Sequence, residues 1–232
     1  MWDSLAKIAP NVANYSDRFM QALSATFQMF FIAGLLTLAI GGVFGILLVV
    51  TKADGIKPSR AVHTALELVT NVFRSIPFII LLIFLIPFTR MLVGTSIGVR
   101  GAVIPLVFGA VPFFTRQVES ALSGVEPGKV EAARAMGSGT VGIICRVYLK
   151  EALPALIRAV TITSISMIGL TTSAGAVGAG GIGSFAINYG QNMHYQDIVN
   201  VCVVILLVLV SLIQIVGNTL SRKTYNRELF KR

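Results

Sequence analysis

Charged residues are scarce in this chain: Asp, Glu, Lys and Arg together make up only 12% of its 232 residues. In soluble domains charged residues make up about 25%. Hydrophobic residues reach 55%, and the mean hydropathy is +0.81. A water-soluble domain of this length needs a far more polar surface, so the composition excludes that class and predicts an integral membrane protein.

Cysteine is nearly absent as well, because Cys145 and Cys202 are the two in the sequence and they lie far apart. Neither has a companion at CxxC spacing, which excludes a disulfide framework and a cysteine-based metal site. Acidic residues number 10 against 19 basic ones, giving a formal charge of +9. In a membrane protein such an excess marks cytoplasmic loops more often than nucleic-acid binding.

Apolar stretches predict an all-α protein with five transmembrane helices. The expected spans are residues 22–50, residues 75–89 with a helical extension over 62–73, residues 101–115 continuing past Arg116, residues 157–175, and residues 198–221. The chain then divides into an extracytoplasmic or interfacial segment (1–21), a transmembrane domain (22–221) and a basic cytoplasmic tail (222–232). Trp2, Leu5, Ile8 and Val12 recur at roughly helical spacing, which fits an interfacial helix or an irregular terminus equally well.

The distribution of Lys and Arg predicts the orientation in the membrane. Basic residues gather in three segments, residues 52–60, 116–158 and 222–232, which five spans would place on the same side. Because cytoplasmic loops carry the excess of positive charge, the N-terminus is expected outside and the C-terminus in the cytoplasm.

The cytoplasmic segment of residues 116–151 is too long for a simple connection and predicts a helix–turn–helix. Ser123 and Glu126 have capping-box spacing, and Pro127 suits the first turn of a helix. Gly137 is well placed to end that helix. From spacing alone, a solvated helix on the membrane surface and a helix that docks on a partner are equally good interpretations.

Two glycine-rich motifs resemble nucleotide-binding loops but lack their context. Residues 178–183 satisfy GxGxxG, yet they follow a membrane span rather than a strand. A re-entrant or gating turn at the outer face, formed by Gly178, Gly180, Gly181 and Gly183, fits better. Residues 124–129 are one residue too short for a phosphate loop, and no Ser or Thr follows. Neither motif is therefore expected to bind a nucleotide.

The fourth span is rich in hydroxyl groups, and a polar substrate path is one interpretation of that pattern. The candidates are Thr163, Ser166, Met167 and Thr171. The other interpretation is that these hydroxyls bond to their own helix or to neighbouring helices. Asp, Glu and Lys are missing from the middle of every expected span, which counts against an ion-coupled pump. His63 and Glu67, four residues apart, are interpreted as a polar pair rather than a metal site, and no cofactor is expected.

Glu131-Ala132-Ala133 followed by Gly137 resembles the EAA motif of permease subunits of ABC importers. More of the sequence, roughly residues 20–220, is similar to methionine-importer permeases in particular. The segments that carry this similarity are residues 71–82, 86–90, 93–98, 133–137, 151–154 and 174–183. One departure is that Lys150 stands after Leu149 where the family has Pro, although Pro154 follows.

The resemblance implies a type I importer-permease fold and a coupling helix that docks on an ATPase subunit. Its coupling residues would be Glu126, Glu131, Ala132, Ala133, Met136 and Gly137. It further implies a homodimer in the bacterial plasma membrane, with two ATPase subunits and an extracytoplasmic binding protein. The chain itself would be no enzyme, and would move methionine (the L form, with the D form as a further candidate) by alternating access.

Three other functions fit parts of the sequence. The same class of importer could carry another amino acid or a small polar solute. An ATP-independent secondary transporter would normally contain internal repeats, which the sequence does not show. A non-transporting membrane scaffold would use the cytoplasmic helix only for binding. None of these alternatives involves nucleic acid, and all of them leave the chain in contact with membrane lipid.

Overall fold

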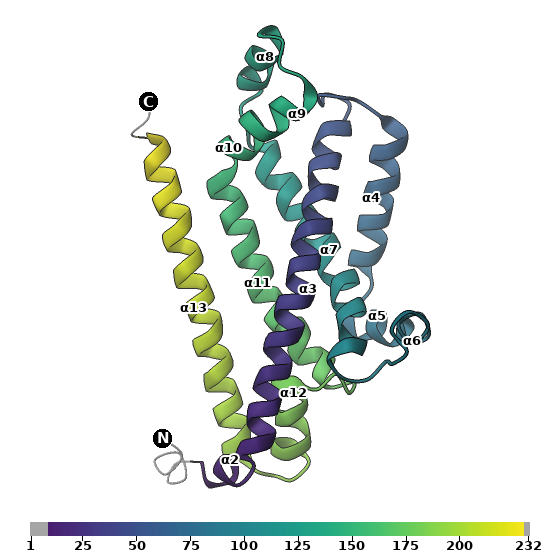
Figure 1. The fold of residues 1–232 in the computed structure, drawn as a ribbon, viewed down its shortest axis with the longest axis vertical. Coiled ribbons are helices and arrows are strands. Elements are labelled where there is room, and N and C mark those ends of the chain that lie inside the picture. Colours follow the sequence, from purple (N-terminus) through teal and green to yellow (C-terminus); the bar gives the residue numbers. More distant parts are fainter. Residues whose placement is uncertain (1–8, 230–232) are drawn as a thin grey trace. The chain divides into compact units, whose positions relative to one another are not determined.

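The computed structural model describes residues 9–229, with side chains described up to Tyr225. Throughout that range the regular structure is helical and contains no strand (Figure 1). The helices are α2 (Pro10–Asn14), α3 (Ser16–Thr51), α4 (Arg60–Ser75), α5 (Phe78–Phe84), α6 (Ile86–Val93), α7 (Gly98–Ser123), α8 (Pro127–Ala135), α9 (Thr140–Ile143), η1 (Ile144–Tyr148), α10 (Leu149–Glu151), α11 (Leu153–Gly175), α12 (Gly181–Phe185), η2 (Ala186–Gln191) and α13 (Gln196–Leu229). The predicted all-α class is confirmed.

Four helices are long and apolar enough to cross a membrane, namely α3, α7, α11 and residues Gln196–Tyr225 of α13. Helices α4 and α5 make a fifth span only if they are taken together, because the chain bends by 104° between them. The prediction of one continuous helix there is wrong, and Pro77 is the reason. Its ring has no N–H to donate and disfavours helical geometry at Ile76, so a new helix begins after it.

The other span boundaries are closer to the prediction. Helix α3 begins at Ser16, earlier than expected, while α7 continues past Arg116 as predicted. Of the proposed interfacial residues, Trp2, Leu5 and Ile8 lie outside the described residues. Val12 lies in α2, where it is fully buried.

The chain forms two compact units, and helices α3, α7, α11 and α13 contribute residues to both. Of the described residues, unit 1 contains 9–36, 76–109 and 164–212. Its core joins α2 and the start of α3 to α12 and the start of α13, through Ala9, Val12, Phe19, Ala22, Ile182, Phe185, Ile198 and Cys202. Asn11 strengthens this core, since its backbone and side-chain N–H groups both donate to Asp197 at 3.0 Å.

Unit 2 contains residues 37–75, 110–163 and 213–229. Its buried core is formed by Val49, Phe114, Val118, Leu122, Ala152 and Ala159. Gly45 lets α3 and α7 approach closely, because a Cβ atom there would lie 2.6 Å from Val118. Gly41 likewise faces Phe114. The GxxxG spacing of these two glycines therefore serves helix packing within the chain.

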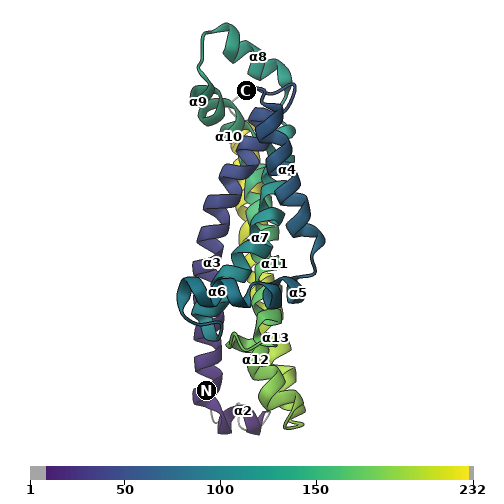
Figure 2. The same cartoon turned by 90° about the vertical axis from the view of Figure 1, so that its right-hand side faces the viewer.

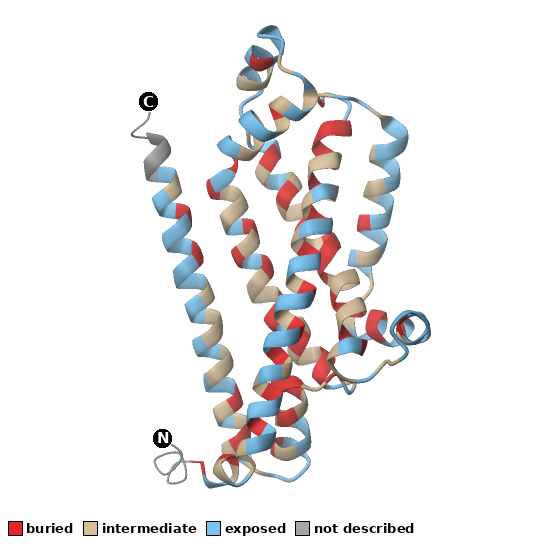
Figure 3. Cartoon of the chain, in the orientation of Figure 1, coloured by how far each residue is buried: buried red, intermediate tan, exposed pale blue. Residues whose placement is uncertain are grey.

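Much of the apolar surface of the spans is exposed, as the pale blue stretches of Figure 3 show. On α13, Leu207 and Ile215 are 61% and 62% exposed. Contiguous apolar surface of this kind is rare on soluble proteins and is typical of surfaces that face lipid or another protein chain.

Candidate functional site

The short helix α8 (Pro127–Ala135) contains Glu131, Ala132 and Ala133, and the other predicted coupling residues lie directly beside its two ends. Only one of these ends is built as the sequence predicts. Pro127 occupies the first helical position, after Glu126 in an extended conformation. No side chain caps this end, and Ser123 belongs to the last turn of α7. The predicted capping box is therefore wrong, because Glu126 stands before the helix rather than in its first turn.

The end of α8 is confirmed at Gly137, which has φ 78°. Its N–H donates to the carbonyl of Arg134 at 2.9 Å, and the N–H of Ser138 donates to the carbonyl of Ala133 at 3.0 Å. These two hydrogen bonds satisfy carbonyl groups that the end of the helix leaves without a partner. They require the residue after the helix end to be left-handed, a conformation that favours glycine. The chain thus reverses direction sharply after the EAA segment.

The predicted coupling residues do not share one face of α8. Ala133 is buried in its own subunit, at 5% exposure, whereas Glu131 and Ala132 are exposed. Met136 is 78% exposed and Val141, in α9, is 73% exposed. Glu126 and Gly137 are exposed as well. The surface that α8 offers to a partner therefore combines small, acidic and apolar groups.

Charged groups surround α8 within unit 2. Arg134 and Lys129 bond to other segments of the chain, and neither interaction was foreseen from the sequence. Tyr148, in η1, has a raised pKa, chiefly because it is partly buried and additionally because of the nearby negative charge of Asp54. The positive charge of Arg134 opposes this shift in pKa. These groups therefore interact with one another electrostatically.

A second polar cluster joins α4 to α7. The predicted pair of His63 and Glu67 is present, with 3.8 Å between Nε2 and Oε2. The sequence did not suggest that Arg116 would reach the same carboxylate at 3.6 Å, Glu119 at 2.6 Å and the side-chain oxygen of Asn71 at 2.8 Å. The spacing of Arg116 and Glu119, three apart on one helix, is the sequence signal that could have indicated their contact.

The candidate path residues of α11 differ in their exposure. Thr163, Met167 and Thr171 are buried, at 2%, 1% and 1% exposure, and Ser166 is half-buried. Thr171 donates to the carbonyl of Ile168 in its own helix. Among the four, Ser166 is the side chain that another molecule can reach directly.

The glycine turn, residues 175–183, connects α11 to α12 inside unit 1. Gly178, Gly180 and Gly181 have φ values of 86°, 80° and 79°, a conformation that favours glycine. A Cβ atom on Gly181 would lie 2.7 Å from Oγ1 of Thr26, and one on Gly183 would overlap the carbonyl of Thr172. The backbone between α11 and α12 is irregular, and Gly181 and Gly183, in α12, leave no room for a side chain. A gating role for this turn stays a prediction.

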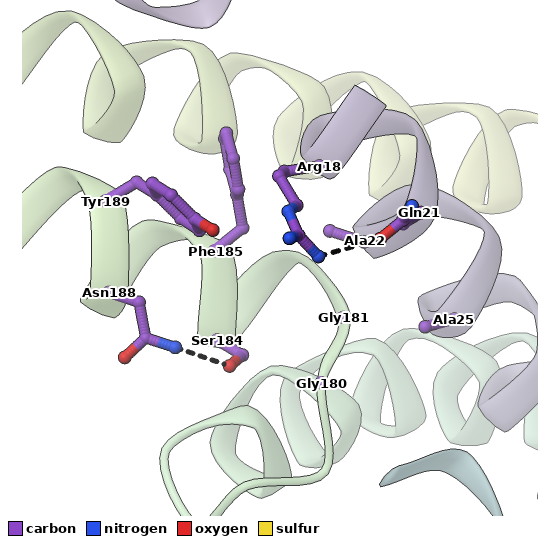
Figure 4. A pocket seen from close by; sticks show the side chains of 10 residues that line it. All are labelled: Arg18, Gln21, Ala22, Ala25, Gly180, Gly181, Ser184, Phe185, Asn188 and Tyr189. Carbon is purple, nitrogen blue, oxygen red and sulfur yellow. Dashed lines mark hydrogen bonds between the residues drawn. The ribbon is translucent and has the colours of Figure 1, made fainter. Parts of the chain in front are cut away.

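Two hydrogen bonds attach the glycine turn to other helices. The N–H of Ile182 donates to Oγ1 of Thr26 in α3 at 2.8 Å, and the carbonyl of Gly178 accepts from the N–H of Gly98 at 3.0 Å. A pocket of about 280 Å³ lies against Gly180 and Gly181 (Figure 4). Arg18 lines it and donates to the side-chain oxygen of Gln21 at 3.5 Å, and no carboxylate among the described residues pairs with this guanidinium.

Comparison with known proteins identifies the class to which these features belong. Residues 41–225 match the family described as binding-protein-dependent transport system inner membrane component. The chain is 42% identical to a probable D-methionine transport system permease protein MetI of Vibrio cholerae, over 97% of this chain and 100% of that protein. It is 43% identical to the methionine import system permease protein MetP of Bacillus subtilis, over 75% of this chain and 79% of that protein.

A solved structure agrees with these relatives. The MetNI methionine ABC transporter, in an inward-facing conformation, contains a chain that matches with a TM-score of 0.88 and 41% identity, covering 91% of this chain and 98% of that one. The resemblance drawn from the EAA segment and the predicted type I permease fold are both confirmed. The chain therefore belongs to the inner membrane components of binding-protein-dependent transport systems, as a permease subunit of an ABC importer.

Proposed function

We propose that this chain is the transmembrane subunit of an ATP-driven importer of methionine. The observation that carries the proposal is the similarity to methionine permeases over nearly the whole chain, together with an exposed α8 that bears the EAA residues. In this proposal two copies of the chain form the translocation path. Two ATPase subunits hydrolyse ATP, and the chain itself performs no hydrolysis.

Energy enters this proposed mechanism through α8. ATP binding closes the two ATPase subunits on each other, and the two α8 helices docked on them move together. Glu131, Ala132 and Met136 supply the contact, since all three are exposed on α8 or directly after it. A nearly complete conformational switch needs about 5.5 kcal/mol of differential binding. We assign that contribution to the ATPase.

Methionine enters from an extracytoplasmic binding protein and crosses by alternating access. We place Ser166 on the path, because its side chain is accessible, and we assign Thr163, Met167 and Thr171 a supporting position behind it. The glycine turn forms the outer gate, with Gly178 as its least crowded glycine. The orientation is N-terminus outside and C-terminus in the cytoplasm of a bacterial plasma membrane, as the basic segments favour.

Uptake of labelled methionine tests this function directly. The chain is expressed with its ATPase and binding protein in bacteria that lack their own methionine importer, and each partner is then omitted in turn. We expect uptake only when all three are present, and competition by unlabelled L- and D-methionine defines the stereoselectivity. Uptake without the ATPase would contradict the proposal in favour of a secondary transporter. If another solute competes for uptake and methionine does not, the importer class stands and only the proposed substrate is wrong.

A further inference from the structure

We propose that Arg134 is a positioning residue that fastens the end of α8 to the turn between α3 and α4. Through this attachment, a movement of α8 reaches both helices of the same subunit. The inference rests on the proposed function, because it concerns how motion of the ATPase is delivered to the permease.

The contact is made by one guanidinium and two backbone carbonyls. Nη2 of Arg134 donates to the carbonyl oxygen of Ile56 at 2.5 Å and to that of Gly55 at 3.3 Å. Both partners lie in the α3–α4 turn, residues 52–59, and α8 lies beside this turn in Figure 2. Hydrogen bonds from a charged donor are stronger than those between neutral groups. Arg134 therefore binds the backbone of the turn itself rather than a movable side chain.

The turn that receives this contact is held firmly to the end of α3. The N–H of Lys57 donates to the carbonyl of Val50, and that of Ser59 donates to the carbonyl of Thr51, both at 3.0 Å. Gly55 is buried, and a Cβ atom there would overlap the carbonyl of Val50. A force applied to the carbonyls of Gly55 and Ile56 is therefore passed to α3 and α4 instead of being absorbed by a loose loop.

The other end of α8 has a different attachment. Lys129 forms an ion pair with Glu151, which ends α10 shortly before α11 begins. Between the two contacts, Ala133 packs against its own subunit. Helix α8 thus has two fastenings, from Lys129 toward α11 and from Arg134 toward α3 and α4. Both contacts lie near the surface: the side chains of Lys129 and Glu151 are 31% and 40% exposed, and Arg134 is exposed as well.

The experiment compares transport with ATP hydrolysis in the complete complex of permease, ATPase and binding protein, reconstituted in liposomes. In Arg134→Ala we expect ATP hydrolysis to continue while methionine taken up per ATP falls about tenfold, the equilibrium effect of losing a charge-assisted hydrogen bond. Arg134→Lys should recover only part of this, because an ammonium lacks the planar fork of donors. Arg146→Ala is the matched control, since Arg146 is exposed on η1 and makes no ion pair with the described residues.

An unchanged ratio of uptake to hydrolysis in Arg134→Ala would overturn the inference. If ATP fails to drive uptake even in the wild-type complex, the proposed function fails instead, so the two failures are distinguishable. A second measurement does not depend on whether Arg134→Ala folds. The two native cysteines are removed by Cys145→Ser and Cys202→Ser, and spin labels are attached at Ala53→Cys and Ala135→Cys. These labels report the distance between the turn and α8 while Arg134 is intact.

We expect the shortest distance between these labels, the one within a subunit, to be the same with and without ATP. That result supports α8 and the turn moving as one body. A change of this distance on ATP binding would overturn the inference, because it would show that α8 moves without the turn.

Discussion

Helix α8 and the glycine turn are both short irregular insertions between long helices, yet they are held in opposite ways. Side chains fasten α8, through Arg134 and Lys129, and leave its apolar Met136 exposed. The glycine turn is held by its own backbone groups and by close packing, because Gly181 and Gly183 lie too close to neighbouring groups for any side chain. Helix α8 is attached near its ends and exposed between them, whereas the turn is tightly packed at Gly181 and Gly183.

This difference predicts where substitutions affect stability and where they affect function. An exposed side chain on α8 can be exchanged without disturbing the core, so changes there should alter transport and leave folding intact. The glycine turn has no such freedom at its crowded positions, because close-packed interiors yield little. Each of the following predictions would strengthen or refute that contrast.

The largest effect is expected from Gly183→Ala. The new methyl group would overlap the carbonyl of Thr172, a backbone atom that cannot rotate away. We expect a loss of about 3 kcal/mol or more of stability, at the upper end of overpacking costs. Thermal unfolding of the detergent-purified complex measures it. Ser184→Ala, which removes only an exposed hydrogen bond to Asn188, should unfold near the wild-type temperature. Equal stability of all three proteins would contradict the tight packing of the turn.

Glu131→Lys should have the next largest effect, and this effect should be on transport rather than on stability. Glu131 is exposed on α8, so the substitution leaves the core of unit 2 unchanged. We expect normal amounts of protein in the membrane but at least about tenfold less methionine uptake, because reversing one charge at a docked surface costs more than 1.4 kcal/mol. Lys150→Glu reverses a charge outside α8 and serves as the control. Normal uptake by Glu131→Lys would remove this residue from the coupling surface.

A smaller effect on stability is expected where one side chain holds the glycine turn. Thr26 is 3% exposed, and its Oγ1 accepts the N–H of Ile182, which is also buried. Thr26→Val keeps the shape but leaves that N–H without a partner, at a cost of about 1–3 kcal/mol. Thr219→Val is the control, because its hydroxyl is exposed and bonds only to its own helix. If Thr26→Val and Thr219→Val unfold at the same temperature, the hydrogen bond to Ile182 contributes no measurable stability.

The part of this architecture that the sequence predicts is the part determined by local chemistry. Gly137 marks the end of α8 because its left-handed conformation suits glycine, and the apolar stretches mark the spans. The break at Pro77 was equally local and could have been predicted from the proline, but the apolar periodicity on both sides of it favoured one continuous helix.

Contacts between distant residues could not be predicted in the same way. Arg134 and Gly55 are 79 positions apart, and Ile182 and Thr26 are 156 apart. No periodicity in one segment specifies which backbone carbonyl a distant arginine reaches. The sequence therefore identified which residues form α8 and the glycine turn, while the folded chain was needed to learn what fastens each of them.

The smallest effect is expected at Gly178, the least crowded glycine of the predicted gate. Gly178 has no atom within 4 Å of where a Cβ would stand. Gly178→Ala therefore loses only the stability that an alanine costs in the left-handed conformation at φ 86°, about 1 kcal/mol. Thermal unfolding should place this variant between wild type and Gly183→Ala. If the turn gates the outer face, methionine uptake at equal protein amounts should fall more than this modest loss of stability explains, because an alanine there restricts the backbone freedom that opening requires. Uptake that falls only in proportion to stability would show that the turn is a fixed element and that the outer gate lies elsewhere.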